Sequence, residues 1–370
     1  MPQPVSHKLS SRARIARYIL HRKQASRQEL AEQLSLSMPT VLQSATELLD
    51  SGVLIESGVY QSRGGRKARA LSLAPGFRYA AGIDVTANHI SFLLLGLDGS
   101  IAASFRIRRL FAHTPEYWEQ LAQDLQVFLR QYPETEGRLL GVGVSLPGIV
   151  DSDRSLLIRS HLLHLENVGL KGLEQRIPYP VRFFNDANSA AYAELVGSSR
   201  NAVYLLLSNS VGGAIYYHQN IVVGDCFKSA EFGHMILQKG GRRCYCGKEG
   251  CLDAYCSALR LTEGLEERLE DFFARLQEGE PAYKDRWEEY LDYLAVAVSN
   301  LRMAFDCDIV LGGYVGSFLE PYMGELSRRV MAYNKFESDT AYLKNCRYPL
   351  EAAAVGGALA FIEEYIGKLC

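Results

Sequence analysis

The sequence lacks any long apolar run, and none of its apolar stretches approaches the roughly 18 residues that a membrane-spanning helix needs. Residues 1–8 also lack the apolar stretch of a secretory signal. No internal repeat and no low-complexity segment is present, which argues against a solenoid and against a linker-like chain. These absences favour a soluble, cytoplasmic protein with no membrane partner.

The chain carries little net charge, but its charge is unevenly distributed. The formal net charge is -2, yet residues 1–78 hold 12 Lys and Arg against 5 Asp and Glu, and the remainder holds 28 against 37. A basic segment joined to an acidic body indicates that the N-terminal part meets a polyanion. The chain has 370 residues, more than the roughly 250–300 at which a single core stops growing, so at least two domains are expected.

The N-terminal region predicts a helix, a second helix, a tight turn and a third helix. Apolar residues at helical spacing, with arginines on the other face, predict a first amphipathic helix over residues 12–23. Ser26 and Glu29 form a capping-box pair that begins a second, short helix. Ser37 caps the third helix, which ends before Gly52.

The third helix and the segment after it carry the predicted DNA contacts. The apolar face of this helix holds Val41, Ala45 and Leu48, and hydrogen-bonding side chains suited to base edges are predicted on the other face at Thr40, Gln43 and Ser44. Two strands flank a basic glycine loop, a predicted wing that would hold phosphates or enter a minor groove through Arg63, Arg66 and Lys67. We predict a winged helix-turn-helix that binds double-stranded DNA, the alternative being a winged helix that contacts proteins or a helical domain with a solvated basic face.

Beyond residue 78 the sequence alternates strands and helices, which indicates an α/β fold. A hairpin is predicted from residues 80–85 and 90–95, and a helix around residues 117–131 leads into residues 139–148, a buried strand that runs into a glycine turn. Further strands are predicted at 181–184, 202–207 and 308–311. Each ends beside polar or glycine residues, which is where open α/β sheets bind ligands.

A cluster of cysteines and one histidine predicts a metal site. Its members are His234, Cys244, Cys246 and Cys251. Three thiolates and one imidazole match a closed tetrahedral zinc site, and the glycines between them allow the chain to wrap the ion. The alternative is a group of free buried thiols beside an unrelated histidine, although cysteines this dense in a reducing compartment are typical of metal binding.

A second group of polar residues predicts a ligand site. Asn185 and Asp186 follow a predicted strand end, and with Glu231 and His234 they supply carboxylates, an amide and an imidazole suited to vicinal hydroxyl groups. Taken alone, an Asn-Asp pair is more often a turn or a helix cap.

Together these motifs resemble the ROK family of repressors and sugar kinases, whose members share a two-lobed, actin-like ATPase fold of the ribonuclease H type. The resemblance covers almost the whole chain and is carried by residues 64–67, 147–148, 185–188 and 231–234 and by the cysteine cluster. It implies a winged helix-turn-helix over residues 1–76, a first lobe over 77–195 completed by a C-terminal helix at 350–370, and a second lobe over 196–349 with the zinc motif.

The resemblance also implies roles for the polar residues. Asp186 matches the base of the family's kinases, and Asn185, Glu231 and His234 match residues that hold the sugar. One imidazole nitrogen of His234 would bind zinc while the other faces the sugar. Asp253 stands where the family has a glutamate, and His161 stands near the position of a family asparagine, so both are predicted sugar contacts.

The resemblance fails where the kinases bind nucleotide. Their Asp-x-Gly-Gly-Thr sequence is replaced at residues 84–88 by Asp-Val-Thr-Ala-Asn, and the second phosphate loop at 208–213 is also altered. Side chains now stand where backbone amides would cradle phosphates, so we predict no phosphoryl transfer. The predicted function is a sugar-responsive repressor of carbohydrate-utilisation genes, acting as a homodimer or dimer of dimers with a sugar or sugar-phosphate effector. An active sugar kinase and a regulator controlled by a protein partner are the alternatives.

Overall fold

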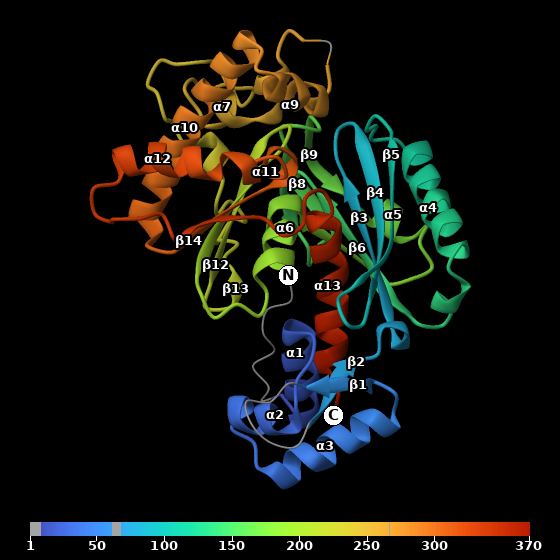
Figure 1. Cartoon of the computed structure of the whole chain (residues 1–370). Coiled ribbons are helices and arrows are strands. Elements are labelled where there is room, and N and C mark those ends of the chain that lie inside the picture. The colour runs from blue at the N-terminus through green and yellow to red at the C-terminus, as the bar shows by residue number, and fades with distance from the viewer. Residues whose placement is uncertain (1–8, 61–67, 266) are drawn as a thin grey trace.

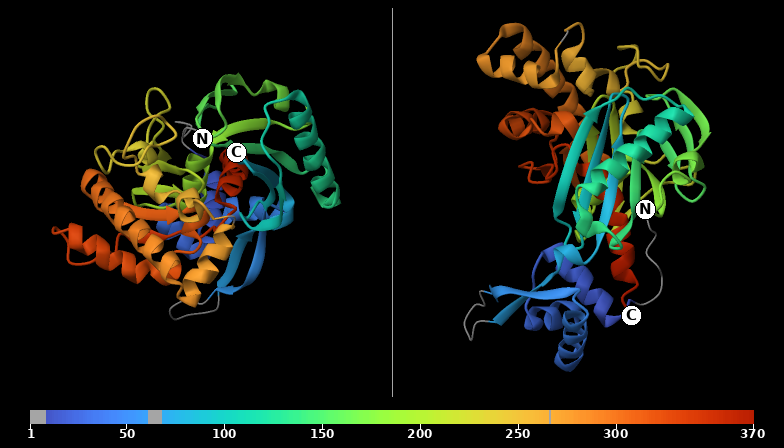
Figure 2. Two further views of the ribbon diagram at one scale, coloured as in Figure 1. Left: turned by 90° about the horizontal axis from the view of Figure 1, so that it is seen from above. Right: turned by 90° about the vertical axis from the view of Figure 1, so that its right-hand side faces the viewer.

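The computed structural model describes residues 9–60, 68–265 and 267–370. A small N-terminal module lies at one end of the molecule, and a larger body built around two five-stranded sheets forms the rest (Figure 1). The second view in Figure 2 shows the module joined to one end of the body, below the first sheet. None of the helices in the described part of the chain combines the length and apolarity needed to cross a bilayer.

The N-terminal module contains three helices and a two-stranded antiparallel ribbon. Its elements are α1 (Ser11–Arg22), α2 (Arg27–Leu34), α3 (Met38–Asp50), β1 (Leu54–Tyr60) and β2 (Ala68–Leu73). The Ser26 hydroxyl accepts a hydrogen bond from the Glu29 amide at 3.1 Å, and Ser37 accepts one from the Thr40 amide at 3.3 Å, so both predicted helix caps are confirmed. The Glu29 carboxylate accepts a hydrogen bond from the Tyr18 hydroxyl at 2.8 Å, which ties α2 to α1.

One predicted DNA contact is wrong. Ser44 is 7% exposed and lies on the buried face of α3 with Val41 and Leu48. The reason is helical spacing: Ser44 follows Val41 by three residues and precedes Leu48 by four, and both intervals keep residues on one face. The predicted wing residues Arg63, Arg66 and Lys67 lie outside the described residues.

The first sheet of the body has the strand order β10-β6-β3-β4-β5. Its strands are β3 (Tyr79–Val85), β4 (His89–Gly96), β5 (Ile101–Arg108), β6 (Leu139–Leu146) and β10 (Val181–Asn185). The predicted hairpin is the antiparallel pair β3 and β4, and β6 runs parallel to β3 and to β10. Apolar residues of α4 (Pro115–Arg130) share a core with one face of this sheet, whereas the other face packs against α13 (Ala352–Gly367). A small antiparallel sheet follows β6 and contains β7 (Ile149–Asp151), β8 (Leu156–Ser160) and β9 (Leu165–Gly169).

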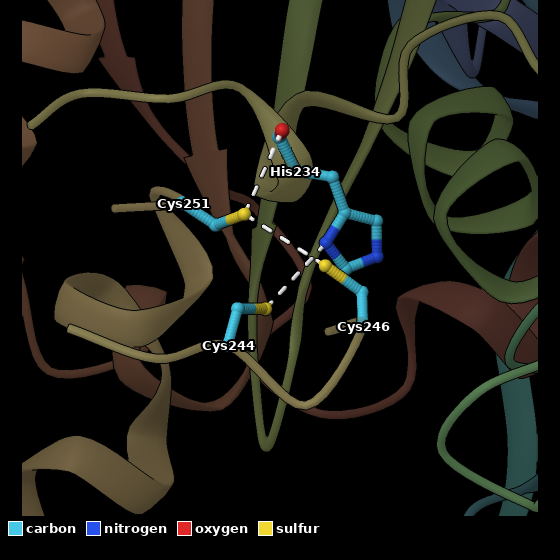
Figure 3. Close-up of side chains that lie close together, drawn as sticks. All are labelled: His234, Cys244, Cys246 and Cys251. Atoms are coloured by element: carbon cyan, nitrogen blue, oxygen red, sulfur yellow. Dashed lines mark hydrogen bonds between the residues drawn. The ribbon is translucent and has the colours of Figure 1, made fainter. Parts of the chain in front are cut away.

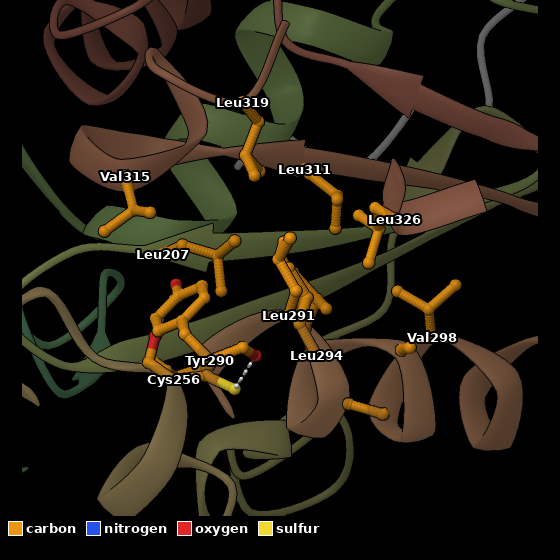
Figure 4. Packing of buried hydrophobic residues seen from close by; sticks show 14 of the residues in the cluster. Leu207, Cys256, Tyr290, Leu291, Leu294, Val298, Leu311, Val315, Leu319 and Leu326 are labelled. Atoms are coloured by element: carbon orange, nitrogen blue, oxygen red, sulfur yellow. Dashed lines mark hydrogen bonds between the residues drawn. The ribbon is translucent and has the colours of Figure 1, made fainter. Parts of the chain in front are cut away.

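The second sheet has the order β13-β12-β11-β14-β15. Its strands are β11 (Ala202–Leu207), β12 (Val211–Tyr217), β13 (Asn220–Ile221), β14 (Asp308–Gly312) and β15 (Leu343–Asn345). One face packs against α9 (Leu269–Glu278), α10 (Pro281–Phe305) and α12 (Met323–Tyr333). Figure 4 shows leucines of the sheet meeting leucines and a valine of α10 and a leucine of α12 in one core. Within it the Tyr290 hydroxyl donates to the Cys256 carbonyl at 2.8 Å, which satisfies a buried polar group.

Two helices lie between the sheets and determine how they meet. These are α6 (Asp186–Leu195) and α13, which pack against each other. A β-carbon added at Gly356 of α13 would stand 1.8 Å from the Ser189 carbonyl oxygen of α6, and one added at Gly357 would stand 3.1 Å from the Gly143 carbonyl oxygen of β6. Only glycine allows backbones to approach this closely.

The remaining short elements are η1 (Pro75–Phe77), η2 (Pro133–Thr135), α5 (Lys171–Glu174), η3 (Phe232–His234), α7 (Asp253–Cys256), α8 (Ala258–Thr262), α11 (Gly313–Gly316) and η4 (Glu320–Tyr322).

Candidate functional site

The predicted metal ligands converge in the loops beside the second sheet. Figure 3 shows His234 and the three cysteines with their donor atoms turned toward one another, and these atoms all lie within 4.8 Å of each other. Cys246 Sγ lies 3.8 Å from Cys251 Sγ, and Cys244 Sγ lies 3.8 Å from His234 Nδ1. A tetrahedron with metal–sulfur bonds of about 2.3 Å has edges of about 3.8 Å. The four residues therefore fit a closed tetrahedral metal site.

The local backbone explains why these four side chains meet. Gly250 has a φ of 80°, and a β-carbon there would stand 1.7 Å from the Gln238 carbonyl oxygen, so only glycine allows the turn that leads into Cys251. The Lys248 ammonium donates to the His234 carbonyl at 2.8 Å, which ties the cysteine loop back to η3. The ligand set is thus held by the backbone of two adjoining loops.

The surroundings of His234 favour its neutral form. Burial, followed by the nearby His161 and Lys248, lowers the pKa of His234 to about 4. A neutral imidazole has a lone pair for a metal ion. Because Nδ1 is the nitrogen beside Cys244, Nε2 is turned away from the thiols.

Asn185 and Asp186 stand at the junction of β10 and α6. Asn185 Oδ1 accepts a hydrogen bond from the Asn188 amide at 2.8 Å, so this residue is the helix cap that the alternative interpretation describes. Its Nδ2 donates to the Gly148 carbonyl at 2.9 Å and to Asp186 Oδ1 at 3.2 Å. The cap therefore also orients the carboxyl group of Asp186, which lines a cleft.

The carboxyl groups around this junction are close enough to affect one another. Burial, together with the nearby Asp84 and Glu231, raises the pKa of Asp186 to about 8, although the Ala187 amide acts in the opposite direction. Burial raises the pKa of Asp84 to about 7 against the opposing charge of Arg106. Burial also raises the pKa of Glu231, because protein surrounds this side chain even though it is open to solvent on one side. Carboxyl groups with raised pKa values in a cleft are typical of functional sites.

The cleft lies between the two sheets and has a volume of about 650 Å³, which is within the usual range for small-molecule sites. Both sides of the cleft contribute polar side chains. From the first sheet, the turn after β3 and the start of α6 come Asp84, Thr86, Asn88, His89, Ser91, Arg106, Arg108 and Asp186, and from the second side come Ser208, Asn209, Ser210, Glu267, Arg268, Glu270 and Tyr314.

Three amides in and beside the turn after β3 are already bonded within the turn. Thr86 Oγ1 accepts hydrogen bonds from the Asn88 amide at 3.4 Å and from the His89 amide at 3.0 Å. The Thr86 amide itself donates to the His89 carbonyl at 2.9 Å. A phosphate loop needs such amides to point at its ligand, whereas here a side chain occupies two of them.

The structure places the other two predicted sugar contacts, His161 and Asp253, in different surroundings. His161 is exposed, and its ring centre lies 5.8 Å from that of His234, so the structure brings these two residues together. Asp253 is 3% exposed, and its Oδ2 accepts hydrogen bonds from the Val211 amide at 2.6 Å and from the Tyr245 hydroxyl at 3.3 Å. The prediction for Asp253 is corrected accordingly, because its carboxylate serves contacts within the protein.

Tyr245 was missed by the sequence interpretation. Its ring centre lies 5.5 Å from that of His234 and 6.2 Å from that of His161. The signal available in the sequence is its place between two metal ligands, since a residue between Cys244 and Cys246 has little freedom to turn away from the site.

Gln43 and Thr40, two residues predicted to contact DNA, are at least partly accessible on α3. Gln43 is exposed, and its Nε2 donates to Glu47 one turn later at 3.0 Å. Thr40 is half-buried and shares a 2.8 Å hydrogen bond with Ser37. Both lie in the first turns of the second helix of the helix-turn-helix, where recognition helices contact bases.

Comparison with known proteins identifies the family to which this architecture belongs. Residues 80–364 match the ROK family over most of the chain. The chain belongs to the ROK family. Its fold is the two-lobed ROK fold preceded by the N-terminal module, and a crystal structure of a ROK transcriptional regulator, a homologue of the E. coli MLC protein, matches it with a TM-score of 0.71 at 20% identity over 96% of each chain.

ROK relatives of two kinds are similar to the chain. The xylose repressor of Bacillus subtilis is 27% identical over 304 residues, which are 79% of each protein. A glucokinase of Halalkalibacterium halodurans is 26% identical over 284 residues, which are 69% of this chain and 86% of the kinase. A ROK glucokinase from Streptomyces griseus, solved with glucose and AMPPNP, has a TM-score of 0.64 at 21% identity and covers 76% of this chain and 98% of its own. The ROK body is therefore common to repressors and kinases.

Proposed function

We propose that this protein is a sugar-responsive transcriptional repressor of carbohydrate-utilisation genes. The single observation that carries the proposal is the combination of a helix-turn-helix module with a ROK body, over a length that also matches a ROK transcriptional regulator. The ROK transcriptional regulator of known structure covers 96% of this chain, which includes the N-terminal module, whereas the Streptomyces griseus glucokinase covers 76%.

The proposed domain limits are a DNA-binding domain over residues 1–76, a first lobe over 77–195 completed by residues 350–370, and a second lobe over 196–349. The packing of α13 on β3 and β6 supports assigning the last segment to the first lobe. Asp186 and Asn185 then belong to the first lobe, and Glu231 and His234 to the second. A sugar held by both sets favours the closed arrangement of the lobes.

The proposed metal is zinc, held by His234, Cys244, Cys246 and Cys251. Its role is structural, since four protein ligands complete a tetrahedral shell. With Nδ1 on the metal, Nε2 of His234 is oriented toward a sugar hydroxyl near His161 and Tyr245.

Phosphoryl transfer is not part of the proposed function. The Thr86 hydroxyl occupies amides that a phosphate loop would use, and Thr86, Ala87 and Asn88 replace the glycines and threonine of the kinases. Asp186 is then an acceptor for a sugar hydroxyl rather than a base. The alternative of an active ROK sugar kinase is favoured by the similarity to glucokinases, and formation of sugar phosphate from ATP would establish it.

A continuous connection links the cleft to the N-terminal module. Ala352 and Ala353, at the start of α13, line the cleft. Near the other end of α13 the buried Glu363 lies 2.9 Å from Arg17 Nε and 2.9 Å from His21 Nε2 of α1. A change in how the lobes meet is therefore transmitted to the module by one rigid helix.

The test is fluorescence anisotropy of the metal-loaded protein on DNA from its own upstream region, with a panel of sugars. We expect tight binding that one sugar weakens. Gln43→Ala should weaken DNA binding about tenfold without changing the sugar response, because it removes a side chain suited to a base edge. Asp186→Ala should leave DNA binding intact and abolish the response.

Two results would contradict the proposal. Absence of DNA binding across a genome-wide operator search would remove the repressor assignment, and a normal sugar response in Asp186→Ala would remove the site assignment. The number of chains bound per operator gives the oligomeric state. A dimer that binds two half-sites would give two chains per operator, and a dimer of dimers would give four.

A further inference from the structure

The part of the cleft formed by β4 and β5 carries a patch of cationic and polar side chains. His89 pairs with Arg108 across the two antiparallel strands, and Ser91 pairs with Arg106. Residues two apart on a strand share a face, so the four side chains lie together, and all four line the cleft. On its other side Ser91 pairs with Asp84 of β3, so this row of residues crosses three strands.

The two arginines of this patch have no ion-pair partner among the described residues. By contrast, Arg268 on the opposite side of the cleft pairs with Asp271 at 3.3 Å. The guanidinium of Arg106 lies 5.8 Å from the ring centre of Tyr314, which places it across the cleft opening. Burial, followed by the charges of Arg106 and Arg108, lowers the pKa of His89, as the strand pairing of these residues leads us to expect.

The carboxylates on the opposite side already have partners. Glu267 accepts a hydrogen bond from the Tyr283 hydroxyl at 2.9 Å and lies 3.1 Å from Arg275. Glu270 interacts with the Tyr314 hydroxyl, whose pKa it raises further after the effect of burial. Arg106 also lies near the Asp84 carboxyl of β3, and Glu270 lies near His89. Among the described residues neither carboxyl group is within ion-pair distance of the two guanidinium groups, so the positive charge of Arg106 and Arg108 is available to a ligand.

The position of the patch limits the shape of that ligand. Asp186 follows β10, and the strand order places β5 four strands away, a span of about 19 Å at about 4.8 Å per strand. A monosaccharide held at Asp186 covers only part of this span. A charged substituent that extends from the sugar ring toward β5 would meet the ends of the long arginine side chains.

We propose that Arg106 and Arg108 bind the phosphate group of a phosphorylated sugar whose hydroxyl groups contact Asp186. The inference rests on the proposed function and names the class of its effector. Guanidinium groups form charge-assisted, bidentate hydrogen bonds with phosphate oxygens. A nucleotide is another source of a phosphate, but the closed turn at Thr86 favours the sugar phosphate.

The test is isothermal titration calorimetry of the full-length, metal-loaded protein with matched pairs of ligands. The pairs are glucose and glucose 6-phosphate, N-acetylglucosamine and its 6-phosphate, and xylose and its 5-phosphate, with inorganic phosphate and ATP as separate probes. We expect one phosphorylated sugar to bind at least tenfold more tightly than its neutral parent. Arg106→Gln and Arg108→Gln should each weaken its binding about tenfold, which is the usual effect of losing one charge-assisted hydrogen bond.

The control variant is Arg130→Gln, which removes an exposed arginine at the end of α4, outside the residues that line the cleft. It should leave the binding of every ligand unchanged, and all three variants should keep the wild-type melting temperature because each arginine is exposed.

Equal binding of a neutral sugar and its phosphate, or a phosphate preference that survives in the Arg106→Gln, Arg108→Gln double variant, would overturn the inference and leave the proposed function intact. Binding of ATP without any sugar phosphate would also overturn it. Failure of every sugar, neutral or phosphorylated, to bind would remove the proposed function itself.

Discussion

Asp186 and Asp84 face the same cleft, and their surroundings set their charge. Burial favours the protonated form of both carboxyl groups, and the nearby Asp84 and Glu231 raise the pKa of Asp186 further. A protonated Asp186 donates a hydrogen bond as well as accepting one. A protonated carboxyl group suits a sugar hydroxyl, because a hydroxyl also both donates and accepts hydrogen bonds. Asp186 then binds the hydroxyl without releasing a proton to the solvent.

The raised pKa of Asp186 predicts a pH dependence of stability. Between its ordinary pKa of 3.8 and its folded-state pKa of about 8, the folded protein holds a proton that the unfolded chain releases, so stability falls as pH rises through this range. Asp186→Asn removes this pH-dependent loss of stability and keeps Oδ1 as a hydrogen-bond acceptor. We expect the free energy of unfolding of the variant, relative to wild type, to increase by about 1–2 kcal/mol from pH 5 to pH 8. Urea unfolding at several pH values measures it, with the exposed Asp153→Asn as control, and a pH-independent difference would refute it.

The cysteine cluster makes a second prediction at this scale. Purified protein should contain about one zinc ion per chain, measured by mass spectrometry of the metal content. Cys246→Ser should lose most of this metal and lower the melting temperature, because metal binding stabilises the folded loops. Cys226 is exposed and lies outside the cluster, so Cys226→Ser should retain the metal. Equal metal content in the two variants would argue against the site.

Among the elements, the contact between α6 and α13 depends on the absence of side chains. Helix α6 begins at Asp186, and α13 crosses it at Gly356, where the Ser189 backbone lies against the glycine. The cap of α6 at Asn185 thus positions Asp186 at one end, and the glycine contact positions α6 against α13. The proposed sugar contact at Asp186 and the glycine contact with α13 therefore lie on the same helix, α6.

Gly356→Ala should therefore be strongly destabilising. An alanine within a helix ordinarily stabilises by up to about 1 kcal/mol relative to glycine. At Gly356 the new β-carbon would stand 1.8 Å from a backbone oxygen, so we expect a loss of about 2–4 kcal/mol in the free energy of unfolding. The matched control is Gly367→Ala in the same helix, where the nearest atom is 4.0 Å away and no loss is expected. Similar denaturation midpoints for the two variants would show that α6 and α13 adjust freely.

Over the whole molecule, α13 is the element that touches both functional regions. Its start lines the cleft, and its later turns contact α1 through Glu363, as the red helix that reaches the N-terminal module shows in Figures 1 and 2. Further contacts fix the module on the body, including the Lys23 ammonium, which donates to the Asp98 carbonyl at 2.8 Å. Coupling between a sugar site and a DNA site requires an element such as α13, whose position depends on the binding of each ligand.

Glu363→Gln should separate the two functions. The substitution keeps the side-chain volume but removes the charge between Arg17 and His21. We expect operator affinity without sugar to stay within about threefold of wild type and the sugar-induced change to shrink at least fivefold, within the usual range of coupling energies. Glu364→Gln is the control, because Glu364 pairs with Arg182 and Lys368 of the body. Anisotropy titrations with and without sugar measure both quantities, and a full sugar response in Glu363→Gln would exclude this connection.

The sequence alone was sufficient for features that contiguous residues determine. Helix caps at Ser26 and Ser37, the strand 202–207 with its observed limits, and the spacing of the cysteine cluster all depend on neighbouring residues, whose pattern is visible in the chain. The face of α3 was also determined locally, and the error at Ser44 came from a misjudged helical position. The combination of motifs was enough to indicate the ROK family.

Only the tertiary structure decided which distant residues meet. Asp253 turns inward because the Val211 amide, brought there by β12, needs an acceptor. Arg106 and Arg108 acquire a role only when β5 is placed at the edge of the cleft, and Glu363 becomes an ion-pair partner only when α1 lies across α13. These contacts join segments far apart in the chain, and their geometry depends on how the sheets and helices pack, which no local pattern encodes.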